Sequence, residues 1–140
     1  MEILKTKEFW YFLIPVLSGF VIYFLGKNKK AERKHLLILF RANQKLSKKI
    51  QEELAVFIEE FDASNAIAFP ERNITYGECL DTMSEEYKLN LSDEQFGIIR
   101  RRKLSKPTLL SLTASLEKQN EALRLLEIDM KMVIKKVRKI

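Results

Sequence analysis

The chain has 140 residues, of which 46% are hydrophobic and 31% are charged, and its formal net charge is +6. This composition is typical of one folded domain rather than of a disordered chain. A single cysteine cannot close an intrachain disulfide, and a single histidine excludes a two-histidine metalloprotease motif. Four glycines and three prolines are few for an all-β protein, so we expect an all-α fold.

A run of eighteen uncharged residues, 9–26, lies close to the N-terminus. A helix of this length spans roughly 27 Å, which is close to the hydrocarbon thickness of a bilayer. The run therefore predicts a single transmembrane helix, anchored at the interfaces by Trp10, Tyr11 and Tyr23 and bent at Pro15. A buried core helix and a cleaved signal peptide are the alternatives. The absence of a basic start and of an Ala-x-Ala site favours an uncleaved anchor.

Basic residues flank this predicted span unequally. Two precede it, Lys5 and Lys7, and five follow it: Lys27, Lys29, Lys30, Arg33 and Lys34. Because basic flanks stay on the cytoplasmic side, we expect residues 1–8 outside the cell membrane and residues 27–140 as a cytoplasmic helical domain. The alternative is a bitopic coiled-coil protein with its C-terminal domain outside the cytoplasm. Small proteins of cell division and phage lysis have that architecture, and this chain shares only the outline.

Apolar spacing in the remaining chain predicts two long helices with two short ones between them. Residues 31–61 carry their apolar side chains on one helical stripe, and residues 62–74 lose the period and form a connection. Short helices are expected from about 75 to 89 and from about 92 to 99. Pro107 suits the first turn of a last helix over 107–139. We predict a small bundle built on a helical hairpin, with 31–61 packed antiparallel against 107–139.

The last predicted helix is apolar on two sides. Ten positions from Leu109 to Ile140 follow a coiled-coil spacing, with Gln119 as the one polar member, and we call them the seam. A shorter stripe on the opposite side, the outer stripe, consists of Leu125, Ile128 and Met132. A helix that is apolar on two sides needs two covers, and 31–61 supplies the first. The second is either the short helices or another copy of the chain. Residues 75–99 contain few large apolar side chains, which favours self-association through the outer stripe.

Charge is distributed along the sequence in blocks. Residues 27–50 contain nine basic and one acidic residue, residues 51–94 contain twelve acidic and two basic, and residues 100–106 contain five basic and none acidic. The basic run Arg100, Arg101, Arg102 and Lys103 is a candidate face for anionic lipid. Nucleic acid is the less favoured ligand, because few aromatic residues interleave the basic ones. The favoured alternative is that this run and the basic residues at 135–139 are a solvated face or contact the acidic middle of the chain.

The sequence contains no recognisable active site. His35 has no acid or nucleophile beside it on a helical face, and Cys79 at a helix start is better explained as a small buried residue. The glycosylation triplets at Asn73 and Asn90 are better explained by turn and cap chemistry. No catalytic, metal-binding or cofactor-binding residue is predicted, and no cofactor or small-molecule substrate is inferred.

Together these observations predict a membrane-anchored, non-enzymatic adaptor or assembly protein that binds protein partners through a coiled-coil face. The alternatives are the bitopic protein of opposite orientation and a membrane-tethered binder of anionic lipid or nucleic acid. An enzyme that uses the Cys79 thiol is the third alternative.

Overall fold

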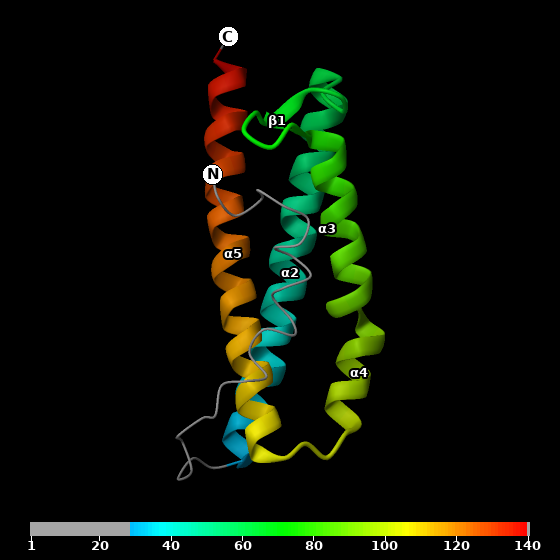
Figure 1. Ribbon diagram of the computed structural model, residues 1–140, viewed down its shortest axis with the longest axis vertical. Coiled ribbons are helices and arrows are strands. Elements are labelled where there is room, and N and C mark those ends of the chain that lie inside the picture. Colours follow the sequence, from blue (N-terminus) through cyan, green and yellow to red (C-terminus); the bar gives the residue numbers. More distant parts are fainter. Residues whose placement is uncertain (1–28, 140) are drawn as a thin grey trace.

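The structure, a computed structural model, describes residues 29–139 and is mostly helical (Figure 1). Its elements, in chain order, are α2 (Lys29–Phe61), β1 (Ile67–Phe69), β2 (Ile74–Thr75), α3 (Tyr76–Asn90), α4 (Asp93–Arg101) and α5 (Lys106–Arg138). The all-α prediction is confirmed, apart from the small antiparallel pair β1–β2. The predicted span 9–26, with Trp10, Tyr11, Pro15 and Tyr23, lies outside the described residues, as does Lys27. Among the helices over 29–139, none combines the length and the apolar character needed to cross a bilayer.

The two long helices lie side by side and run in the same direction (Figure 1). Three contacts between basic and acidic side chains connect them at successive levels: His35 with Glu117 at 3.5 Å, Lys49 with Glu127 at 3.0 Å, and Arg138 with Glu60 at 2.9 Å. Residue numbers rise together in these pairs, whereas they would run in opposite senses in an antiparallel pair. The predicted antiparallel hairpin is therefore wrong, although the extents of both long helices were predicted closely.

The two long helices run parallel because the two short helices between them together lead the chain back along α2. A 33-residue α2 is about 50 Å long, at about 1.5 Å per residue. The 15 residues of α3 and the 9 of α4 together span about 36 Å, and they run back along α2 towards its beginning (Figure 1). The chain thus returns to the end where α2 starts before α5 begins. The bundle is up–down–up, and its middle leg is divided between α3 and α4.

Local signals mark the beginnings of the three later helices. Thr75 caps α3 in a reciprocal capping box with Glu78, since each side chain bonds the other residue's backbone N–H. Ser92 and Ser105 accept hydrogen bonds from backbone amides in the first turns of α4 and α5. Each cap satisfies an N–H group that has no partner inside its helix.

The connection between α2 and α3 is a compact turn structure. Asp62 ends α2 with a positive φ of 49°, and the next amide, Ala63 N–H, donates to the Ile58 carbonyl over 2.9 Å. Asn73 adopts a φ of 55° in the turn between β1 and β2, a conformation that asparagine tolerates better than most residues. Gly77 lies so close to Ser64 that a Cβ atom there would be 2.9 Å from the Ser64 backbone oxygen. These contacts fold the connection onto the end of the bundle.

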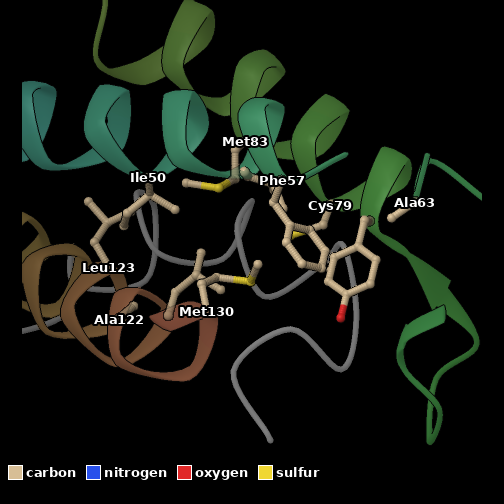
Figure 2. Packing of buried hydrophobic residues seen from close by; sticks show 11 residues of the cluster. Ile50, Phe57, Ala63, Cys79, Met83, Ala122, Leu123 and Met130 are labelled. Atoms are coloured by element: carbon tan, nitrogen blue, oxygen red, sulfur yellow. The ribbon is translucent and has the colours of Figure 1, made fainter. Parts of the chain in front are cut away.

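Two apolar clusters fill the interior and are separated by a polar layer. The larger cluster joins α2, α3 and α5 around Phe57, Met83 and Leu126 (Figure 2). The smaller one, around Phe40 and Phe96, joins α2, α4 and the beginning of α5. The seam supplies buried residues to both clusters, so its cover is α2, as predicted.

In the polar layer, Asn43 is fully buried and makes three hydrogen bonds. Its amide donates to the Leu116 carbonyl over 2.9 Å and to Gln119 Oε1 over 3.0 Å, and its own Oδ1 accepts from Asn120 over 2.8 Å. Gln119, the polar member of the seam, therefore has its partner within the same chain. This layer fixes the register of α2 against α5, because any slip would leave buried amides unpaired.

Candidate functional site

Two basic segments that are far apart in the sequence meet at one end of the bundle. One is the beginning of α2, and the other comprises the last turn of α4 and the residues that follow it, beside the start of α5 (Figure 1). We call this surface the cationic end, and its exposed members are Lys29, Lys30, Lys34, Arg100, Arg101, Arg102 and Lys103. The parallel arrangement of α2 and α5 creates it, since an antiparallel hairpin would have placed residues 100–103 beside the far end of α2.

Arg33 ties these two segments together. Its guanidinium donates to the backbone carbonyls of Arg102 over 2.7 Å, Ile99 over 3.3 Å and Arg100. These carbonyls belong to the end of α4, where the last carbonyls of a helix lack intrahelical donors and carry a partial negative charge. Arg33 therefore caps α4 from α2, and its side-chain donors are engaged by these carbonyls. The basic side chains that follow Ile99 are held beside those of α2.

Residues 100–103 supply four of the exposed basic side chains at the cationic end. No ion pair is recorded there for the side chains of residues 100–103. Glu32 is the acidic residue in the first turn of α2, and the first turn of α5 contains none. α5 also begins at this end, and a helix N-terminus carries a partial positive charge. This end of the bundle therefore carries an excess of positive charge.

The C-terminal part of α5 is also basic but faces acidic residues. We call residues 131–139 the basic tail. Arg138 pairs with Glu60 over 2.9 Å, and Lys131 lies 3.7 Å from Glu127. Hydrogen bonding by Lys49 lowers the pKa of Glu127, so this carboxylate is charged at neutral pH. Of these contacts, the pair between Arg138 and Glu60 joins the basic tail to the acidic middle of the chain.

An open groove runs between the basic tail and the end of α2. Its volume is about 670 Å³, and Glu52 and Glu53 line it opposite Lys131 and Lys135. Mixed charge of this kind favours contact between the two helices over the binding of a ligand of one sign.

The outer stripe is exposed to solvent. The side chains of Leu125, Ile128 and Met132 are 49%, 53% and 65% exposed. The short helices do not cover them, because α3 and α4 pack mainly against α2. Of the two covers weighed for this stripe, the short helices are therefore excluded. Acidic and basic residues both flank the stripe, with Glu121 and Lys131 among the exposed ones.

The groups considered for catalysis are now placed. Cys79 is 2% exposed within the larger cluster, and burial raises the pKa of its thiol to about 12 (Figure 2). The thiol is therefore protonated at neutral pH, which is unfavourable for a nucleophile. His35 is exposed on α2, with the Glu117 carboxylate of α5 at 3.5 Å. Among residues 29–139 no group of three or more His, Cys, Asp or Glu side chains could hold a metal ion.

The fold buries the carboxyl group of Glu86, which was not among the residues predicted from the sequence. Glu86 lies on α3 and is 5% exposed. Asn90 donates to its Oε2 over 2.7 Å, whereas its Oε1 has no hydrogen-bond partner within the described chain. Burial raises the pKa of this carboxyl. Helical periodicity places Glu86 three residues after Met83, on the inner face of α3, and this was the only available indication.

Neither protein-family models nor curated proteins nor solved structures give a match to this chain. The function is therefore argued from its own residues.

Proposed function

We propose that the protein is a membrane-anchored, non-enzymatic adaptor or assembly protein whose helical bundle self-associates through the outer stripe. The observation that carries this proposal is the exposure of Leu125, Ile128 and Met132 on a helix whose other apolar side is already buried. Three adjacent large apolar side chains on a long helix favour contact with another protein surface. The coiled-coil seam packs against α2 within the same chain. We therefore propose that the outer stripe, rather than the seam, is the face that binds a protein partner.

Flanking charges support a second copy as the partner. Glu121 and Asp129 lie beside the stripe together with Arg124 and Lys131, so one copy offers both signs of charge to another. Opposite charges beside an apolar stripe strengthen helix pairing and select its orientation.

Sedimentation of the full chain in detergent tests the association. We expect a wild-type dimer, and we expect Ile128→Glu with Met132→Glu to give a folded monomer because both side chains are exposed. The matched control is Ile38→Glu with Val56→Glu on α2, at side chains 59% and 56% exposed, and this variant should remain dimeric. A wild-type monomer would contradict self-association, and a stripe variant that unfolds would place the stripe in the core.

Membrane attachment and orientation need a separate test. The proposal rests on the uncharged run 9–26 and on the basic residues that follow it. The full chain should resist carbonate extraction, and deletion of 9–26 should release it. With Lys135→Cys in place, an impermeant maleimide should label the protein only after the cells are permeabilised, because residue 135 is expected in the cytoplasm. Cys79 is buried, so the label reports on residue 135 alone. Labelling in intact cells would support the opposite orientation, which is the alternative function.

A further inference from the structure

We propose that the cationic end binds the headgroups of anionic phospholipids and thereby holds the bundle upright on the bilayer. This inference rests on the proposed membrane anchoring and adds a lipid class to it. The surface is built from two segments, residues 29–34 and 100–103, which the fold brings together at one end.

Position is the first argument. The described chain begins at Lys29, three residues after Gly26, the last residue of the uncharged run. Three residues reach at most about 11 Å even when they are fully extended. The first turn of α2 is therefore within about one Debye length of the headgroups when residues 9–26 span the membrane. Arg33 binds the end of α4 to that same turn, so residues 100–103 are held near the bilayer as well.

Charge is the second argument. Arg100, Arg101, Arg102 and Lys103 are exposed and have no recorded ion pair with another described residue. Each basic residue close to an anionic leaflet strengthens attraction about fivefold. The basic tail lies at the opposite end of α5, and Arg138 there is already paired with Glu60. The two basic segments thus differ both in their distance from the membrane and in their compensation.

Composition is the third argument, and it favours lipid over nucleic acid. Neither 29–34 nor 100–103 contains an aromatic residue, so the surface offers no platform on which bases could stack. Flexible, exposed lysine and arginine side chains suit the laterally mobile phosphates of a lipid surface. The long helix α5 also begins at this end, and its N-terminus adds to the positive potential.

The test uses the full chain in nanodiscs of phosphatidylcholine, with and without phosphatidylglycerol, and measures backbone hydrogen exchange. At low salt, we expect phosphatidylglycerol to slow exchange of the amides of residues 100–104 at least about fivefold, consistent with the attraction of a single basic residue. High salt should remove this difference, because exposed charges are screened. Arg100→Glu, Arg102→Glu and Lys103→Glu together should abolish it. The matched control changes Lys135, Lys136 and Lys139 to glutamate at the opposite end and should leave it unchanged.

Equal exchange in the two kinds of nanodisc would overturn the inference, and so would loss of the effect in the control variant. Stronger protection by an added RNA oligonucleotide than by phosphatidylglycerol would also overturn it, in favour of nucleic acid. The wild-type comparison of lipids needs no variant, so it stands even if a substituted chain folds poorly. A chain that fails to insert into phosphatidylcholine contradicts the proposed function, whereas a chain that inserts without any lipid-dependent difference contradicts this inference alone.

Discussion

The cationic end and the basic tail contain the same kinds of residue, and the fold gives them different surroundings. At the basic tail, Arg138 and Lys131 contact carboxylates at Glu60 and Glu127. At the cationic end, the Arg33 side chain caps α4, and no ion pair is recorded for residues 100–103 in the described chain. Local composition therefore does not tell whether a basic run is available for binding. The direction in which α5 runs along α2 decides it.

The largest expected effect is in the cluster that supports the cationic end. Phe40 is 1% exposed and its ring centre lies 5.5 Å from that of Phe96 on α4. Phe40→Ala should lower the free energy of unfolding by about 3–5 kcal/mol and loosen α4 from α2. Thermal denaturation measures the first effect. Hydrogen exchange measures the second, because the substitution should increase the exchange rate more in α4 than in the β1–β2 turn region. A loss below about 1 kcal/mol would contradict this packing.

The polar layer should give the next largest effect. Asn43→Leu leaves Gln119 and Asn120 without their buried partner, which should cost about 1–3 kcal/mol of the free energy of unfolding. Asn43→Leu combined with Gln119→Leu should recover part of that loss, because neither of these two positions then holds an unpaired amide. Chemical denaturation of the three variants measures the coupling. Strict additivity of the two substitutions would show that these side chains do not act as a pair.

Arg33 connects the two halves of the cationic end. Its replacement tests whether its hydrogen bonds to α4, rather than its positive charge alone, stabilise the fold. Arg33→Gln should lower the free energy of unfolding by about 1–2 kcal/mol, since the α4 carbonyls lose charged donors but can still reach water. Exchange at residues 99–102 should rise more than exchange at the basic tail. Lys34→Gln removes one charge from the same turn and serves as the control, with an expected change within about 0.5 kcal/mol.

The smallest expected effect is a pH dependence from Glu86. Its pKa is raised by burial, so the folded state binds the proton more tightly than the unfolded state does. This contribution to stability is fully present below the ordinary glutamate pKa and is lost as pH rises through the raised folded value. Glu86→Gln should flatten that part of the stability profile. A variant with the same pH dependence as wild type would assign it to another group.

The sequence predicted the elements better than it predicted their arrangement. Both long helices, the buried seam and the beginnings of the short helices near residues 75 and 92 follow from periodicity and local hydrogen bonding, which act within a few residues. The direction of α5 depends on the summed length of α3 and α4, which no local pattern states. The β1–β2 pair was missed because its strands have only 3 and 2 residues.

Of the candidate surfaces, too, the one within a single helix could be predicted, and the one built by tertiary contacts could not. The outer stripe could be found in the sequence because Leu125, Ile128 and Met132 share one face of a single helix. The cationic end could not be found, because it joins residues 29–34 to residues 100–103 through the tertiary contacts of Arg33. Burial of Glu86 likewise depends on what packs against α3.

The central claim is that α2 and α5 run parallel, which places both basic segments at one end. Distances between spin labels test it most directly, in full chains with Cys79→Ala and one labelled pair each. We expect a short distance for Lys34→Cys with Lys103→Cys, and a distance of about 35 Å or more for Lys34→Cys with Lys135→Cys, from the rise per residue along the helices. A short distance between positions 34 and 135, with 34 and 103 far apart, would show an antiparallel hairpin and contradict the account.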